Sequence, residues 1–269
     1  MTHTLITQPD DPRIAAYTSI REKDLTRGHV GRFIVEGKIT LETLLTRSRF
    51  ALESLFLCET RLEPLSSLLA QMPDDVPVFV APQTVMDEIV GFPIHRGVLA
   101  CGVKGKTVTI EEQIKALGDG PRTILALVGL SNHDNVGACF RNAAAFGADA
   151  VLLDAQSCDP LYRKAIRVSS GASLWLPFAH QGSATDILKT LHAYGFETWA
   201  MTPRENASNL TDLTRPDRLA IVLGAEGPGL SAETIAQATS PVRINMSSGF
   251  DSINVATAGA IALSQVFPP

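Results

Sequence analysis

Three short segments of the chain combine small residues with side chains that could bind or activate a ligand. The first runs from Ser131 to Ala143 and contains Asn135 and Arg141. It lies where an apolar strand ends and a helix begins, which is the usual ligand edge of a parallel sheet. We expect Asn135 or Asp134 to cap that helix. The neighbours of Arg141 at helical spacing are all tiny, namely Gly137, Ala138, Ala144 and Ala145. This pattern fits close approach by another chain or an anionic ligand, and it also fits a packed helix with a solvent-facing arginine.

The second segment is rich in glycine and runs from Leu223 to Ser231. Gly224, Gly227 and Gly229 allow unusual backbone angles and close approach of a ligand after a buried strand. Ser231 can cap the next helix, which leaves Glu226 in the loop. The alternative is an ordinary tight turn between a strand and a helix.

The third segment, from Ile244 to Ala256, passes from a strand through a polar loop into a helix. From Ser252 to Val266 the chain has fifteen residues without a charge, many of them small. A helix without a charged face is buried all round. Near a chain terminus this favours a subunit interface, with a helix buried in its own domain as the alternative.

The elements that must position these segments alternate between strand and helix. Apolar strands are predicted at 123–129, 150–154, 197–201, 219–224 and 242–246, and helices at 136–146, 184–193, 231–237 and 252–266. Fully apolar strands that alternate with helices predict an α/β fold with a parallel sheet covered on both faces.

The first part of the chain predicts a separate small α/β domain. Its sequence RFIVEGKITLETLLTRSRF is typical of a strand and then a helix, and ALESLFLCE and VPVFVAP are typical of further strands. A glycine-containing stretch with few large apolar residues follows. We therefore expect a first domain over 1–105, a linker over 106–121 and a second domain over 122–269.

Composition excludes several classes of protein. No run approaches the ~18 apolar residues that a membrane helix needs, and the first residues do not have the pattern of a signal peptide. The four cysteines are far apart, which favours a reducing cytoplasm, and the scattered histidines give no support for a metal site. No G-x-G-x-x-G follows the first strand of the second domain, so a dinucleotide-binding oxidoreductase is a remote alternative. The net charge of −5 argues mildly against nucleic acid.

Taken together, the three segments resemble the signature motifs of the SpoU (TrmH-like) branch of the SPOUT RNA methyltransferases. The motifs N-x-G-x-x-x-R, G-x-E-G-x-G and M-x-x-x-x-x-S-[LI]-N-V occur in that order, and Ile166–Ala172 is similar to the family's middle region. RFIVEGKITLETLL and GFPIHRGVLACG resemble the ribosomal-protein-L30e-like substrate-binding domain that is often joined to these enzymes. The resemblance spans nearly the whole chain.

The resemblance implies a knotted catalytic domain, a homodimer, and methyl transfer from S-adenosylmethionine to a ribose 2′-oxygen of RNA. We expect 23S rRNA first, with tRNA or a non-catalytic RNA-binding or ribosome-assembly role as alternatives. By motif matching, the reaction site would comprise Asn135, Arg141, Ser252 and Asn254. The cofactor would be held by Leu223, Gly224, Glu226, Gly227, Gly229, Ile244, Met246 and Ile253.

Two features qualify the resemblance. The family usually has Asp-Pro where this chain has Asn132 and His133, so we expect the turn before the first helix to be shaped differently. The acidic net charge also means that RNA contacts should depend on local basic strips, namely Arg13–Arg32 and Arg163-Lys164-Arg167.

Overall fold

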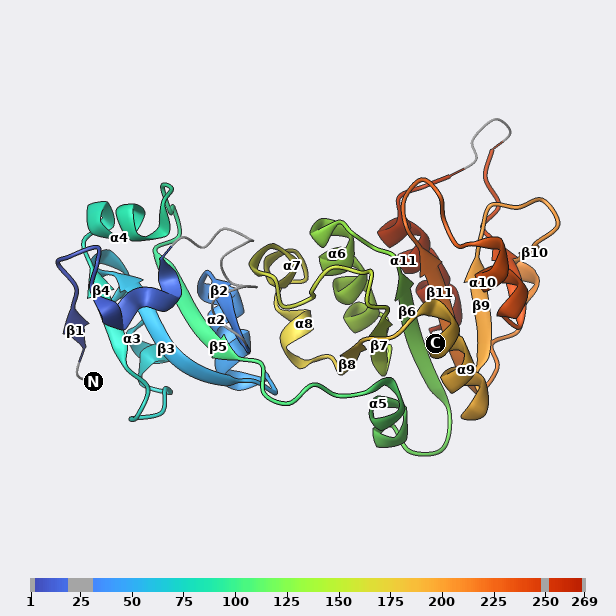
Figure 1. Cartoon of the computed structure of the whole chain (residues 1–269), viewed down its shortest axis with the longest axis horizontal. Coiled ribbons are helices and arrows are strands. Elements are labelled where there is room, and N and C mark those ends of the chain that lie inside the picture. The colour runs from blue at the N-terminus through green and yellow to red at the C-terminus, as the bar shows by residue number, and fades with distance from the viewer. Residues whose placement is uncertain (1–2, 19–30, 248–251, 268–269) are drawn as a thin grey trace. The chain divides into compact units, whose positions relative to one another are not determined.

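The chain forms two compact units in a computed structural model that describes residues 3–18, 31–247 and 252–267 (Figure 1). The first unit comprises Met1–Lys106 together with Leu161–Trp175, and the second comprises Thr107–Pro160 and Leu176–Pro269. The division near residue 106 lies at the end of the expected first domain. The short segment 161–175 groups with the first unit, although we expected it within 122–269.

In its described residues, the first unit contains a five-stranded mixed sheet with the strand order β1-β4-β3-β5-β2. Its strands are β1 (Thr4–Leu5), β2 (Arg32–Glu36), β3 (Ala51–Cys58), β4 (Val78–Ala81) and β5 (Val98–Val103). Its α-helices are α2 (Lys38–Thr46), α3 (Ser66–Leu69), α4 (Gln83–Val90), α7 (Arg163–Val168) and α8 (Ala172–Trp175). Short 3₁₀ helices cover Pro12–Tyr17 and Glu59–Arg61.

Strand β5 pairs antiparallel with both β2 and β3, and β4 pairs parallel with β1 and β3. The strands predicted from RFIVE, ALESLFLCE and VPVFVAP are confirmed, whereas β5 and α4 were not predicted. Gly102 in β5 is required by packing, because a Cβ there would lie 2.3 Å from Cζ of Phe33.

The second unit contains a seven-stranded sheet in its described residues, with the order β10-β12-β9-β11-β6-β7-β8. Its strands are β6 (Arg122–Val128), β7 (Ala150–Leu153), β8 (Phe178–His180), β9 (Glu197–Met201), β10 (Ser208–Asn209), β11 (Arg218–Gly224) and β12 (Ser240–Arg243). Every pairing in this sheet is parallel. The predicted α/β fold with a parallel sheet is therefore confirmed.

Helices pack on both faces of this sheet, which explains its fully apolar strands. The helices are α5 (Ile110–Ala116), α6 (His133–Ala145), α9 (Ala184–Ala193), α10 (Ala232–Gln237) and α11 (Val255–Val266), with a 3₁₀ turn at Leu210–Asp212. Residues of α5, α9 and α10 share one core with Ile124 and Val222 of the central strands. Because side chains alternate along a strand, Leu125 and Leu223 face the other side, where α6 and α11 pack together.

Helix α5 lies within the stretch that we expected to be a linker. Thr109 and Glu112 form a capping box at its start, with reciprocal hydrogen bonds of 3.1 and 2.8 Å. Ile110 and Ile114, one helical turn apart, are buried in the core of the second unit. The segment is therefore part of the second unit's core and is not a linker.

The last helix differs from its prediction in two ways. It begins at Val255 rather than at residue 252, because Asn254 is its N-cap. Within one chain it is not buried all round: Ala256 and Ala262 are buried, whereas Thr257 and Ile261 are exposed. Its lack of charge therefore leaves an uncharged exposed side in the single chain.

No helix in the described part of the chain is long and apolar enough to span a bilayer.

Candidate functional site

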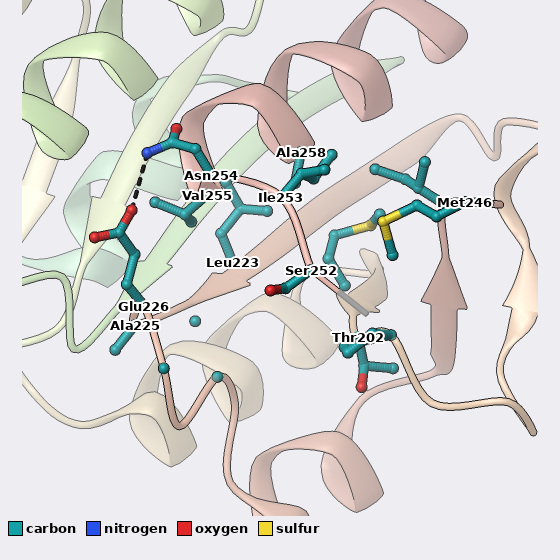
Figure 2. A pocket seen from close by; sticks show the side chains of 16 residues that line it. Thr202, Leu223, Ala225, Glu226, Met246, Ser252, Ile253, Asn254, Val255 and Ala258 are labelled. Atoms are coloured by element: carbon teal, nitrogen blue, oxygen red, sulfur yellow. Dashed lines mark hydrogen bonds between the residues drawn. The ribbon is translucent and has the colours of Figure 1, made fainter. Parts of the chain in front are cut away.

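A pocket of about 380 Å³ opens at the carboxyl ends of β9, β11 and β12, beside the start of α11 (Figure 2). The residues that line it come from the glycine-rich loop, from the segment that leads into α11 and from the end of β9. They are Met201, Thr202, Pro203, Leu223, Gly224, Ala225, Glu226, Gly227, Gly229, Ile244, Met246, Ser252, Ile253, Asn254, Val255 and Ala258. The second and third segments of the sequence thus meet at one place.

The glycine-rich loop folds back tightly on the end of β11. A Cβ at Gly224 would lie 2.4 Å from the backbone nitrogen of Leu230 and 2.5 Å from the carbonyl carbon of Gly229. Gly229 donates its N–H to the carbonyl of Ala225 at 3.0 Å, and Gly227 and Gly229 adopt positive φ angles of 85° and 66°. The glycines therefore allow the loop to pass very close to the end of β11, and the backbone of this loop lines the pocket.

The side chain of Asn254 connects the three sequence segments at a junction of hydrogen bonds. Its Oδ1 accepts hydrogen bonds from the backbone N–H groups of Ala256 at 2.9 Å and Thr257 at 3.3 Å, which caps α11. Because only the oxygen of the amide can accept these bonds, its NH₂ group must point away from the helix. That group donates to Oδ1 of Asn135 at 3.0 Å and to Oε1 of Glu226 at 2.9 Å. Figure 2 shows the bond between Asn254 and Glu226.

These bonds fix the orientation of Asn135 as well. Its Oδ1 accepts from Asn254, so its own NH₂ group is the part left to donate elsewhere. Asn135 lies on α6 and is 7% exposed. One residue from each of the three sequence segments, Asn135, Glu226 and Asn254, is therefore joined in a single hydrogen-bonded cluster.

Most of the expected site residues line this pocket, but Asn135 and Arg141 are not among its lining residues. Ser252 and Ile253 lie in the segment that enters α11, and Ile244 and Met246 follow β12. Arg141 is exposed on α6, and its side chain makes no hydrogen bond or ion pair with any residue in the described ranges. Residues 248–251 of the third segment lie outside the described residues.

The start of α6 corrects the expected N-cap. Asn132, rather than Asn135 or Asp134, is the N-cap, and its Oδ1 accepts the N–H of Asp134 at 2.8 Å. Asparagine and aspartate are comparable N-caps, and His133 takes the first helical position, where proline is favoured. The Asn-His pair that stands in place of Asp-Pro therefore still produces a capped helix start.

A buried carboxylate supports this turn from the neighbouring strand. Asp154, which follows β7 and is 4% exposed, accepts hydrogen bonds from the N–H of Gly129 at 2.9 Å and from the hydroxyl of Ser157 at 2.7 Å. The hydroxyl oxygen of Ser157 in turn accepts the N–H of Leu130 at 3.0 Å. The loop that leads from β6 to Asn135 is thus held by the loop after β7.

Three lining residues at the end of β9, Met201, Thr202 and Pro203, were not predicted from the sequence. They carry no motif, but β9 pairs with β11, so their carboxyl ends share one edge of the sheet. A prediction of strand order would have found them, because residues that follow adjacent parallel strands lie together.

The basic strips that we expected to contact RNA are partly paired with carboxylates of the same chain. Arg13 is paired with Asp11, and Arg32 donates to Glu53 at 2.6 Å. In the second strip, Arg163 forms a short ion pair with the buried carboxylate of Glu36, which also lies 3.7 Å from Arg167. Between Arg13 and Arg32, the basic residues Arg21, Lys23, Arg27 and His29 lie outside the described residues.

The described residues contain no group of histidine, cysteine and carboxylate side chains that could hold a metal ion.

Fold and site together define a class. The chain is an α/β protein with a glycine-lined pocket at the carboxyl edge of a parallel sheet, beside the N-terminus of the last helix. Pockets at this edge of a parallel sheet are typical small-molecule sites. The SpoU rRNA Methylase family matches residues 122–264. The chain belongs to that family.

Related proteins match over most of the chain. An uncharacterized tRNA/rRNA methyltransferase of Mycobacterium tuberculosis is 38% identical over 264 residues, covering 96% of this chain and 89% of the relative. A 23S rRNA (guanosine-2′-O-)-methyltransferase of Nitrosomonas europaea is 33% identical over 184 residues, covering 67% of this chain and 69% of the relative.

Solved structures match both units. A crystal structure of an RNA 2′-O ribose methyltransferase has a TM-score of 0.76 and 26% identity, and the match covers 97% of each chain. An AdoMet-bound rRNA methyltransferase from Sinorhizobium meliloti has a TM-score of 0.80 at 19% identity, covering 97% of this chain and 96% of that one.

The donor role of Asn254 can be tested by the substitution Asn254→Asp. Aspartate caps a helix as well as asparagine does, but it cannot donate to Asn135 and it brings a second carboxylate beside Glu226. We expect a loss of about 1–2 kcal/mol in the free energy of unfolding, measured by urea titration at pH 7.

The matched control is the double variant Asn254→Asp with Glu226→Gln. Its glutamine can donate to the new carboxylate, so part of the lost stability should return. An Asn254→Asp protein as stable as the wild type would show that the two donated bonds contribute nothing.

Proposed function

We propose that this chain is an S-adenosylmethionine-dependent methyltransferase that modifies a ribose 2′-oxygen of RNA. The observation that carries the proposal is the junction of Asn135, Glu226 and Asn254, which joins the family's three motifs at the edge of one pocket. Membership of the SpoU rRNA Methylase family supports RNA as the substrate. The similarity to an RNA 2′-O ribose methyltransferase supports the ribose as the target.

The pocket is suited to a nucleoside-sized cofactor. Its volume of about 380 Å³ lies within the range of small-molecule sites. Backbone around Gly224, Ile244 and Met246 would hold S-adenosylmethionine, with Leu223 and Ile253 as apolar walls. The glycine-rich loop also lines the pocket, through Glu226, Gly227 and Gly229. The structurally similar Sinorhizobium meliloti protein is described as AdoMet-bound.

When bound, S-adenosylmethionine supplies an electrophilic methyl group on a positively charged sulfur. The 2′-hydroxyl of a ribose is a poor nucleophile until it loses its proton, so orientation and proton removal are the tasks left to the protein. Ser252 lines the pocket. The NH₂ group of Asn135, whose Oδ1 is bonded to Asn254, would donate to an oxygen of the substrate. Asn254 orients Asn135 and Glu226.

Arg141 would bind a phosphate of the RNA and orient the ribose. Arginine side chains are cations with a planar fork of N–H donors, so they suit an anion better than they suit proton abstraction. Its exposed position and its lack of a partner among the described residues leave the side chain available to an incoming RNA. Any role of Arg141 as a base is secondary in this mechanism.

We infer 23S rRNA as the first candidate substrate and tRNA as the second. The Nitrosomonas europaea relative is a 23S rRNA enzyme, whereas the mycobacterial relative is described only as a tRNA/rRNA methyltransferase. A non-catalytic RNA-binding module is the alternative function. The presence of Asn135, Arg141, Ser252 and Asn254 together weighs against it.

We also propose a homodimer formed through α11. The exposed side of this helix carries Thr257 and Ile261 without a charge, and Ile261 is 40% exposed. Charged residues are depleted at the centre of protein interfaces, so the uncharged exposed side of α11 suits a surface that is covered in an assembly. The trefoil knot, the L30e-like character of the first unit and a cytoplasmic location stay predictions from the sequence.

The activity is tested by incubating the protein with methyl-labelled S-adenosylmethionine and with total RNA from cells that lack this protein. We expect label at a defined nucleotide, in a linkage that resists alkaline cleavage because a methylated 2′-oxygen cannot attack the adjacent phosphate.

We expect Arg141→Lys to lower kcat at least about tenfold, since lysine lacks the planar fork that binds a phosphate through two donors. No label in any RNA would favour the binding module, label on a base would contradict ribose methylation, and an unimpaired Arg141→Lys enzyme would contradict the phosphate role.

The dimer is tested by Ile261→Asp, with Ile39→Asp as the matched control. Ile39 is 69% exposed on α2, so the same change there adds the same charge to a different surface. By sedimentation velocity we expect a dimer for the wild type and for Ile39→Asp, and a monomer for Ile261→Asp. An Ile261→Asp protein that remains fully dimeric would contradict the proposed interface.

A further inference from the structure

Asn142 makes a second connection between α6 and α11. It lies in the first sequence segment, next to Arg141, but it is not among the site residues expected from the motifs. Its Nδ2 donates to the backbone carbonyl of Ala256 at 2.8 Å, and the two residues are 114 positions apart in the chain. Ala256 is the second residue of α11 and is 5% exposed. The bond therefore joins the C-terminal half of α6 to the buried first turn of α11.

Asn135 and Asn142 lie on the same side of α6. They are seven residues apart, which is about two helical turns at 3.6 residues per turn. Asn135 contacts the N-cap of α11 and Asn142 contacts its first turn. Arg141, one residue earlier, is rotated about 100° around the helix and is exposed. One face of α6 thus binds α11 while the adjacent face presents the arginine.

Ala256 links these contacts into one chain of hydrogen bonds. Its N–H donates to Oδ1 of Asn254, and its carbonyl accepts from Asn142. Asn254 then donates to Asn135 and Glu226. A shift of the first turn of α11 relative to α6 would therefore change the orientation of the amide that holds both site residues.

We propose that Asn142 is a positioning residue of the methyltransferase site. By holding Ala256, it fixes the first turn of α11 against α6 and so sets the geometry of Asn254, Asn135 and Glu226. This inference rests on the proposed function for its kinetic consequences, whereas its structural consequence can be measured without any activity.

The kinetic test uses Asn142→Asp, which keeps the shape of the side chain and removes the donor. We expect kcat to fall by about ten- to a hundredfold, the range that small misplacements of reacting groups produce, with the KM for S-adenosylmethionine changed less than threefold. The matched control is Gln237→Glu on α10, which loses a similar donated bond, of 3.1 Å to Glu233, outside the pocket lining. Its kcat should stay within twofold of the wild type. An Asn142→Asp enzyme with the kcat of the control would overturn the proposal.

A double-mutant cycle separates positioning from general destabilisation. If Asn142 acts through Asn254, then Asn142→Ala should lower kcat much less in an Asn254→Ala background than in the wild type. Equal effects in both backgrounds would show that Asn142 does not act through this junction.

Hydrogen–deuterium exchange gives a readout that needs no catalysis. In Asn142→Asp we expect faster exchange in peptides from the first turns of α11, and unchanged exchange in β11 and α9. If the wild type does not methylate RNA but this pattern is found, the proposed function fails and the positioning role stands. Unchanged exchange over α11 would overturn the positioning role whether or not the wild type is active.

Discussion

The organisation of the site depends on one side-chain amide, that of Asn254. Its oxygen accepts two backbone N–H groups at the start of α11, and its nitrogen donates to Asn135 and Glu226. Each half of the amide has partners that only that half can satisfy, so the group has one orientation. Because capping α11 fixes the orientation of the Asn254 amide, it also fixes the hydrogen bonds that this amide donates to Asn135 and Glu226.

The rest of the second unit brings these segments to the same edge. β6 and β11 are adjacent and parallel, so the helix after one and the glycine loop after the other begin side by side. Buried Asp154 secures the turn before α6, and the close crossing at Gly224 allows the loop to fold against the pocket. Because α6 and α11 pack on the same face of the sheet, the N-cap of one can reach a side chain of the other. The pocket is a consequence of this order of strands.

The sequence predicts the parts of this arrangement that depend on local pattern. Apolar runs predict the long strands, and the three motifs contain Asn135, Glu226 and Asn254, which hydrogen bonds join in the structure. Strand order is a long-range property, so the contribution of β9 through Met201 and Thr202 was not predicted. The N-cap of α6 was assigned wrongly because several capping residues stand together, and only the backbone geometry selects Asn132. The pairing of basic residues with carboxylates of the first unit is likewise a tertiary feature.

The most direct test of the central claim, that the pocket beside the Asn254 junction holds the methyl donor, is a crystal structure of the chain with S-adenosylhomocysteine, the demethylated donor. We predict the ligand against Gly224, Met246 and Ile253, with the Asn254 amide still donating to Asn135 and Glu226. A ligand bound at another place, or bound here with the amide of Asn254 turned away from Asn135, would contradict the claim.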